Sequence, residues 1–298
     1  MPELPDIEAY RATLADRIVD RRLGGVRTAS PFFLRTAVPP IAEAAGRVVT
    51  AIRRLGKRLV LALDDDRFLV LHLMIAGRLH WEPAGIDLVP RRHLGALDFD
   101  DGSLTVTEAG TKKRAGLWFV ADAAGLAGHD RGCVEPLEAD RDSFAAALTT
   151  GNHTVKRALT DPRLFSGIGN AYSDEILHAA RLSPAALTGS LDAGATDRLH
   201  AATRDTLTLW RDRLVAEARA AFPEKVTAFR EGMAVHGRYG KPCPACGTAV
   251  QRIKYAGNET NYCPRCQTGG RLLADRYFST LLKKDWPRSI EELESRGG

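Results

Sequence analysis

The first residues that could do chemistry stand at the start of the chain, where Met1 is followed by Pro2 and Glu3. Removal of Met1 would expose the secondary amine of Pro2, and an α-amino group with a pKa of about 8 is partly neutral and nucleophilic at physiological pH. Such an amine can attack a sugar C1′ and form an iminium, as lysines do in Schiff-base enzymes. Taken alone, Met-Pro is more often an ordinary protein start, and Glu3 a solvated acid.

Four of the five cysteines form a second candidate site. Cys243 and Cys246 are one C-x-x-C pair, Cys263 and Cys266 are the other, and 16 residues separate the two pairs. This spacing is typical of tetrahedral structural zinc sites, and four sulfur ligands leave no position for a reacting water. The sequence therefore predicts one structural Zn²⁺ that folds a small hairpin. A zinc ribbon with no ligand of its own is the alternative.

Two further groups of residues could hold phosphate. The run GIGN, residues 167–170, opens a helical pattern, so a phosphate could approach its glycines and the helix N-terminus, with Asn170 and Lys156 as additional donors. On its own, GIGN is more often a simple helix entry. In the cysteine hairpin, Arg252 and Lys254 favour contact with phosphate.

The type of secondary structure predicted around these residues changes along the chain. A helical pattern runs from about Pro5 to Arg22 and would place Pro2 and Glu3 just ahead of its positive end. Short β-rich runs then predict an antiparallel sandwich or barrel. Lys57 falls between two of these runs, where a surface lysine is the default.

Helical patterns follow the β-rich part, and the longest runs from about Asp192 to Phe222. The chain continues about 30 residues beyond the last cysteine. There the basic stretch Arg271–Lys284 carries Leu273, Tyr277 and Leu281 at helical spacing. We expect it to pack on the core; an extension of a DNA-binding surface is the alternative.

Composition and charge narrow the class of protein. A chain of 298 residues that is 44% hydrophobic can bury one large core, or two modest cores with a small module. Residues 225–289 hold 12 Lys and Arg against 4 Asp and Glu, which favours a polyanionic partner. The first 20 residues mix acids and bases, so we expect no signal peptide, no membrane span and a cytoplasmic location.

Together, these motifs resemble those of the formamidopyrimidine-DNA glycosylase and endonuclease VIII family of base-excision repair enzymes. The matches are PELPDIE, GKRL around Lys57, HLMIAGRL around Met74, VEPL, VKRALTD followed by GIGNAYSDEIL, and the four-cysteine finger, in the family's order. The resemblance implies an α+β multidomain fold with DNA held between the domains. The expected domains are an N-terminal antiparallel β-sandwich with a flanking helix (1–135), a helix-two-turn-helix domain (136–224), a zinc-finger hairpin (225–267) and a C-terminal extension (268–298).

The resemblance also implies a role for each matched residue. Pro2 would attack C1′ of a flipped-out damaged nucleotide, Glu3 would shuttle protons, and Lys57 would contact phosphate near the lesion. Excision of an oxidised or ring-opened base would be followed by β/δ-elimination, as in a bifunctional glycosylase and AP lyase. The expected DNA-contacting residues are Met74 as an intercalating wedge, His93, Lys113, Arg114, Lys156, Asn170, Arg252, Lys254 and Asn258.

Two matched regions depart from the family pattern. EAGTKKRAG, residues 108–116, replaces a loop resembling DPRRFG and has Ala115 where the family has an aromatic. Asn258 stands where family members often carry a phosphate-clamping arginine, and it lacks both the charge and the fork. The sequence therefore indicates a divergent member with altered lesion choice.

The expected partner is double-stranded DNA that contains damaged bases or abasic sites, bound by a monomer at the bacterial nucleoid. A non-catalytic damaged-DNA-binding protein would retain Lys156, Asn170 and the zinc hairpin, but the presence of both Pro2 and Glu3 argues against it. A zinc-ribbon protein that binds RNA is a third possibility, and it leaves the N-terminal matches unexplained.

Overall fold

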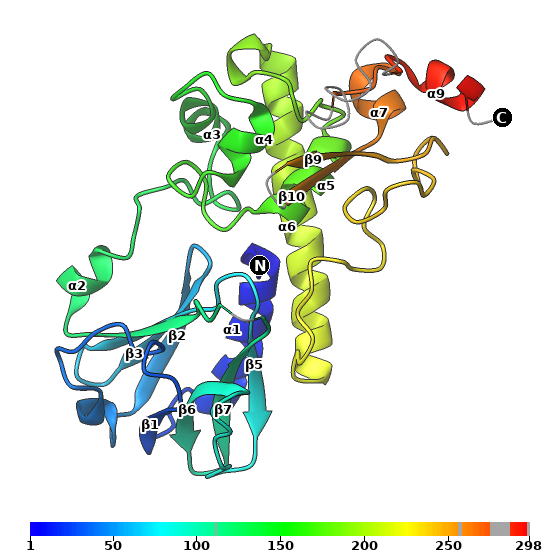
Figure 1. Ribbon diagram of the computed structural model, residues 1–298. Helices are drawn as coiled ribbons and strands as arrows, with labels where there is room; N and C mark the ends of the chain where they lie inside the picture. The colour runs from blue at the N-terminus through cyan, green and yellow to red at the C-terminus, as the bar shows by residue number, and fades with distance from the viewer. Residues whose placement is uncertain (111, 256–257, 275–286, 297–298) are drawn as a thin grey trace. The chain divides into compact units, whose positions relative to one another are not determined.

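The computed structural model describes residues 1–110, 112–255, 258–274 and 287–296 (Figure 1). Within these residues, no helix is long and apolar enough to cross a membrane. The chain divides into two compact units. Unit 1 comprises Met1–Gly132 and Leu209–Thr227, and unit 2 comprises Cys133–Thr208 and Ala228–Gly298.

Unit 1 contains two four-stranded antiparallel sheets. Their strands are β1 (Gly25–Thr28), β2 (Val49–Leu55), β3 (Arg58–Leu63), β4 (Phe68–His72), β5 (Gly77–Glu82), β6 (His93–Phe99), β7 (Gly102–Glu108) and β8 (Gly116–Val120). The strand orders are β1-β6-β7-β5 and β2-β3-β4-β8. One buried core takes apolar side chains from both sheets, among them Leu61, Leu71, Leu97 and Leu104. The predicted antiparallel sandwich is therefore confirmed.

Helix α1 (Leu4–Ile18) flanks the sandwich and contributes buried side chains to the same core. The sequence pattern predicts a helix to Arg22, but the helix ends earlier. It stops because Val19 takes an extended conformation and the N–H of Asp20 donates to the carbonyl oxygen of Val49, at 2.8 Å. The short elements η1 (Ile41–Ala44) and α2 (Ala123–Ala127) complete the unit.

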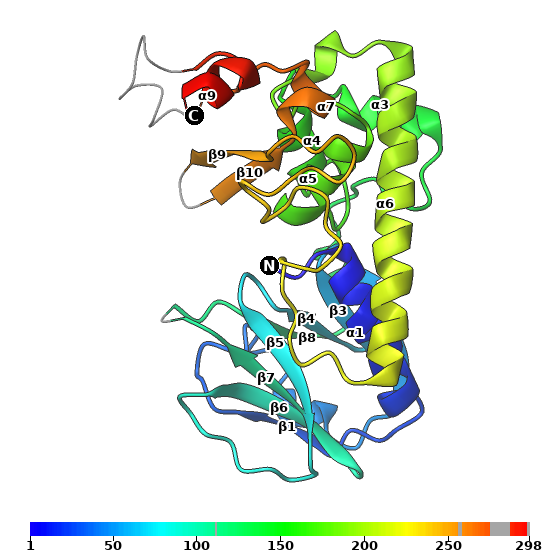
Figure 2. The ribbon, with the colours of Figure 1, turned by 90° about the vertical axis from the view of Figure 1, so that its right-hand side faces the viewer.

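Unit 2 is helical apart from one small hairpin. Its elements are α3 (Arg141–Leu148), α4 (Val155–Thr160), α5 (Asn170–Ala179), η2 (Thr188–Ser190), β9 (Gln251–Tyr255), β10 (Asn258–Tyr262), α7 (Pro264–Thr268) and α9 (Ile290–Arg296). The rings of Phe144 and Phe165 lie 4.8 Å apart in its core, and both are fully buried. The β9–β10 hairpin lies beside α5 (Figure 2).

The long helix α6 (Ala193–Ala220) is shared between the units, and its bounds agree closely with the predicted 192–222. Its last part belongs to unit 1, because Leu214 and Ala218 are buried against Ala9 of α1. The boundary between the two units therefore falls inside this helix, whereas the expected domain boundary follows its end.

The described parts of the C-terminal extension pack on the hairpin. The N–H of Leu273 donates to the hydroxyl of Tyr262 at 2.8 Å, and Ile290 is 1% exposed. Of the stretch Arg271–Lys284, only residues 271–274 lie within the described part of the chain, so its packing on the core stays a prediction. Tyr277 and Leu281, which the helical spacing singles out, lie outside the described residues.

Candidate functional site

The N-terminus of the chain is fixed by the first turn of α1. The N–H of Glu3 donates to Oδ2 of Asp6 at 2.8 Å, and the N–H of Ile7 donates to the carbonyl oxygen of Glu3 at 3.0 Å. Glu3 and Asp6 are 3% and 2% exposed, and Pro2 is also buried. An acid at the third helical position that accepts from the N-cap N–H is half of a capping box. The backbone that follows Pro2 is therefore held in one conformation.

The terminal amine has a depressed pKa. Burial is the main cause, and the charges of Arg78 and Lys57 lower the pKa further, while Glu3 and Asp6 raise it. This amine belongs to Met1 in the full-length chain. The neutral form of an amine is the nucleophile, so burial at this end of the chain acts in the direction that favours nucleophilic chemistry.

Lys57 lies in the turn that joins β2 to β3. Burial lowers its pKa, and the carboxylates of Glu3 and Asp6 act in the opposite direction. Nearby, Arg54 of β2 pairs with Glu8 of α1 at 2.7 Å, which ties the strand to the helix. The structure thus brings Glu3 and Lys57 together, and both act electrostatically on the terminal amine of Met1, the residue before Pro2.

Met74 stands in a tight turn between β4 and β5. It has a φ of +53°, and its N–H donates to Nδ1 of His72 at 3.1 Å. Burial lowers the pKa of His72 to about 4, so the ring is a neutral acceptor at pH 7. Only glycine fits at position 77, because a Cβ there would lie 2.3 Å from the carbonyl oxygen of Leu73. With Ile75 56% exposed beside Met74, the turn presents an apolar tip.

The divergent loop between β7 and β8 is organised by Glu108. Its Oε2 accepts the N–H groups of Arg114 at 2.6 Å and Ala115 at 2.9 Å, and its carbonyl oxygen accepts Nζ of Lys113. Ala115 is 2% exposed and belongs to the core, whereas Arg114 is exposed. Lys113 therefore folds back on its own loop, and Lys112 and Arg114 are its exposed basic side chains.

His93 differs from the expectation of a DNA contact, because it lies inside unit 1. It is 2% exposed; its Nδ1 accepts the N–H of Val89 at 2.9 Å, and its Nε2 lies 3.6 Å from Oε2 of Glu82. Burial lowers the pKa of the ring. A side chain so enclosed cannot reach a nucleic acid from this position.

Lys156 also differs from the expectation. It is 6% exposed, and its ammonium donates to the carbonyl oxygen of Asn170 at 3.1 Å and to Oγ of Ser173 at 3.0 Å, and pairs with Asp174. A lysine has three N–H donors, so these partners use all of them. The positive charge points into unit 2 instead of toward solvent.

Asn170 begins α5 directly after the GIG run. Gly167 has a φ of +76°, a backbone conformation that favours glycine. The amide Nδ2 of Asn170 donates to the carbonyl oxygen of Glu259 in β10, at 2.9 Å. The turn at residues 167–170 is therefore joined to the hairpin.

The hairpin itself presents basic and polar side chains. Arg252 lies over the ring of Tyr239, 4.0 Å from its centroid, and its Nη1 is 3.2 Å from Oε2 of Glu259. Lys254 and Asn258 are exposed. Arg252 and Lys254 lie on one face of the hairpin, whereas Asn258 pairs with Tyr255 and lies on the other face.

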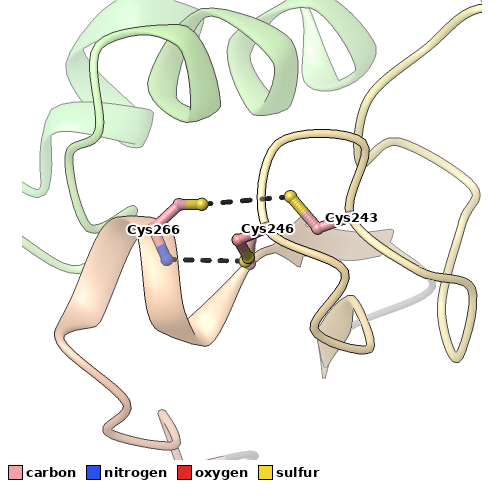
Figure 3. A group of neighbouring side chains, drawn as sticks. Cys243, Cys246 and Cys266 are labelled. Carbon is pink, nitrogen blue, oxygen red and sulfur yellow. Dashed lines mark hydrogen bonds between the residues drawn. The ribbon is translucent and has the colours of Figure 1, made fainter.

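The four cysteines converge at the base of the hairpin, and Figure 3 labels three of them, Cys243, Cys246 and Cys266. All four Sγ atoms lie within 4.8 Å of one another, with 3.4 Å between Cys246 and Cys263 and 3.9 Å between Cys243 and Cys266. Zn–S bonds of about 2.3 Å in a tetrahedron require sulfurs about 3.8 Å apart, so the cysteines fit one zinc ion. Nε2 of His178 lies 3.3 Å from Sγ of Cys243 and is positioned to support this ligand. The predicted structural zinc site is confirmed.

Several residues at these sites were not recognised in the sequence. Asp6 had a usable signal, because an acid three residues after Glu3 fits a capping box. Arg78, His72, Asp174 and His178 had none, since their importance depends on which distant segments fold against them.

Three family models match the chain. The formamidopyrimidine-DNA glycosylase N-terminal domain covers residues 1–115, and the H2TH domain of the same family covers residues 133–210. The zinc finger found in FPG and IleRS covers residues 240–269.

Curated relatives agree with these models. A formamidopyrimidine-DNA glycosylase of Heliobacterium modesticaldum is 35% identical over 292 residues, which is 90% of this chain and 100% of that protein. A formamidopyrimidine-DNA glycosylase-like protein of Mycobacterium tuberculosis is 41% identical over 149 residues, covering 50% of this chain and 92% of that protein.

Solved structures share the fold. The Lactococcus lactis Fpg (MutM) in complex with DNA containing N7-benzyl-Fapy-dG has a TM-score of 0.80 and 26% identity, covering 90% of this chain and 100% of that one. The Lactococcus lactis Fpg bound to DNA with an abasic site has a TM-score of 0.79 and 25% identity, covering 89% and 99%.

Proposed function

The chain belongs to the formamidopyrimidine-DNA glycosylase family, and on this basis we propose that it is a bifunctional DNA glycosylase and AP lyase of base-excision repair. The observation that carries the proposal is the N-terminal cluster of unit 1. There Pro2 and Glu3 are both buried, the first turn of α1 holds the backbone of Glu3, and the half-buried Lys57 interacts electrostatically with Glu3. A buried acid directly after the proposed nucleophile supports a catalytic role over binding without catalysis.

The proposed reaction starts after Met1 is removed. The neutral amine of Pro2 attacks C1′ of the damaged nucleotide, the bond from C1′ to the base breaks, and the base leaves with a proton. The amine then loses its own proton, the bond from C1′ to the ring oxygen O4′ breaks, and O4′ takes up a proton as the C1′=N iminium forms. Glu3 is the group that moves these protons, because it directly follows the nucleophile and is held by the first turn of α1.

Elimination then cuts the strand. Loss of a proton from C2′ of the iminium expels the 3′ phosphate, and a second elimination expels the 5′ phosphate. Lys57 would contact a phosphate beside the lesion, where its charge offsets that of the leaving group. Its burial near Glu3 is consistent with a position close to the reacting sugar.

The proposed partner is double-stranded DNA with an oxidised or ring-opened base or an abasic site. The Lactococcus lactis relatives were solved with damaged DNA of this kind. Zinc keeps the hairpin folded and takes no part in the chemistry. The protein would act as a monomer in the cytoplasm, at the nucleoid. The side chains proposed to contact DNA are Met74, Arg114, Asn170, Arg252, Lys254 and Asn258. Three residues expected from the sequence are left out, because His93 and Lys156 are buried and Lys113 folds back on its own loop.

Excision from lesion-bearing duplexes tests this function. The processed protein is mixed with duplexes that each carry one oxidised or ring-opened purine or pyrimidine, and base release and strand cleavage are measured separately. We expect Glu3→Gln to slow excision by about 100-fold or more while DNA binding persists. Asp16→Asn, which removes an exposed acid of the same helix, is the matched control and should be unaffected.

One outcome would contradict the proposal. If the processed wild-type protein binds abasic DNA but neither releases a base from any duplex of the panel nor cuts the strand, the non-catalytic alternative is correct.

A further inference from the structure

Asp174 of α5 is the centre of a buried network in unit 2. The residue is 1% exposed. Its Oδ1 pairs with Nζ of Lys156, and its Oδ2 accepts Nδ1 of His236 at 2.8 Å and the N–H of Asn261 at 3.1 Å. One carboxylate thus joins α4, the segment that leads into the cysteine hairpin, and strand β10.

Glu175, the next residue of α5, binds the same incoming segment. Its Oε2 accepts the N–H of Ala234 at 2.6 Å, and its Oε1 accepts the N–H groups of Val235 at 2.9 Å and His236 at 2.8 Å. Three consecutive backbone donors on one carboxylate leave this segment little freedom. The two acids together therefore hold the approach to the hairpin on α5.

Lys156 connects this network to the turn at residues 167–170. Its Nζ donates to the carbonyl oxygen of Asn170, whose own side chain donates to Glu259 of β10. The same ammonium therefore touches both the residue that begins α5 and the carboxylate that holds the hairpin. Removing it would leave Asp174 as a buried charge without its cation, which is strongly unfavourable.

We propose that Lys156 is a positioning residue: with Asp174 it fixes the zinc hairpin on α5, so that the turn at 167–170 and the hairpin meet the DNA backbone in a set arrangement. The claim that Lys156 and Asp174 hold the hairpin on α5 rests only on the hydrogen bonds and the ion pair described above. The part that concerns DNA rests on the proposed function. A direct contact between Lys156 and a DNA phosphate is the competing assignment.

Hydrogen–deuterium exchange of the zinc-loaded full chain tests the first part without DNA. We expect Lys156→Met and Asp174→Asn to speed exchange in residues 234–237 and 258–262, while exchange in α3 stays unchanged. The double variant Lys156→Met/Asp174→Asn removes both charges and keeps the experiment interpretable if a single variant does not fold. Arg157→Met changes an exposed cation of the same helix and should have no effect. Equal acceleration throughout unit 2, or none in the hairpin, would overturn this part.

The salt dependence of binding to an abasic-site duplex tests the second part, at a temperature well below unfolding. The plot of log K against log [salt] has a negative slope, and each lost phosphate contact makes it less steep by about 0.9. We expect Lys156→Met to raise Kd by about 3- to 30-fold, as for substitutions that act on a binding site indirectly, with the wild-type slope retained. Lys254→Met should make the slope less steep, and it serves as the control for loss of a direct phosphate contact.

Two results would overturn the second part. If Lys156→Met makes the slope less steep by as much as Lys254→Met does, Lys156 is a phosphate contact. If Lys156→Met leaves Kd unchanged, Lys156 has only a structural role. Absence of salt-dependent binding by the wild-type protein would refute the proposed function and with it this part, and the exchange experiment would still decide the role of Lys156 in holding the hairpin.

Discussion

The N–H of Glu3 donates a 2.8 Å hydrogen bond to Oδ2 of Asp6, and both side chains are at most 3% exposed. This bond fixes the orientation of the residue that directly follows the proposed nucleophile. The positive end of a helix dipole also disfavours a protonated amine nearby. The first turn of α1 therefore fixes the backbone beside the proposed nucleophile, whereas burial is the main cause that lowers the pKa of the terminal amine of Met1.

Protonation of His72 should destabilise unit 1. Its pKa is about 4 in the folded protein against 6.5 for an ordinary histidine, so the stability that neutral His72 contributes is complete above pH 6.5 and is lost as pH falls from 6.5 toward 4. The loss is at most about 3 kcal/mol. Urea unfolding at pH 7 and pH 4.5 should show a smaller drop in His72→Asn, whose side chain can still accept the N–H of Met74. Equal drops in both proteins would refute this role.

Met74→Ala should slow excision from a fully paired duplex by about 10-fold, because extruding a base costs a few kcal/mol that an apolar wedge helps to offset. Excision from single-stranded DNA should not change, since no base pair has to be opened there. Single-turnover rates on the two substrates check this. A similar decrease on both would mean that Met74 does not act as a wedge.

Asn258→Arg should strengthen DNA binding, because an arginine can form a charged, forked contact with phosphate. We expect the slope of log K against log [salt] to become steeper by about 0.9. Asn258→Gln, which adds length without charge, is the control and should leave the slope alone. An unchanged slope in the arginine variant would show that this edge of the hairpin does not meet the DNA backbone.

Removal of zinc should release the hairpin while the sandwich of unit 1 stays folded. Metal analysis should find one zinc per chain, and Cys246→Ser should lose it to a chromogenic chelator at least about 10-fold faster than the wild type. Cys133→Ser, at the one cysteine outside the site, is the matched control. Equal release from Cys246→Ser and wild type would place the metal elsewhere.

Much of the fold could be predicted because its signals are local. The cysteine spacing, the helical period of α1 and α6, and the β-rich runs each report on residues close in sequence. Strand β5, with the sequence GRLHWE, has no run of β-branched residues, so its own sequence does not indicate a strand. It forms because it pairs with β7.

The parts of the site that could not be predicted depend on distant partners. Lys156 and Asn170 both matched a phosphate-binding pattern, but the burial of Lys156 depends on Asp174, 18 residues away. His93 likewise matched by residue type, and its enclosure follows from the folding of residues 82–89 around it. The sequence carries no signal for which way these side chains face, because that depends on segments distant in the chain.

The central claim is that the amine of Pro2 attacks the sugar, and borohydride trapping tests it most directly. Processed protein that starts at Pro2 is mixed with an abasic-site duplex and borohydride, and the adduct is located by mass spectrometry of the proteolysed complex. We expect one covalent adduct on the N-terminal peptide at Pro2, and none with protein that retains Met1. An adduct at Lys57 or another lysine, or no adduct with the processed chain, would contradict the claim.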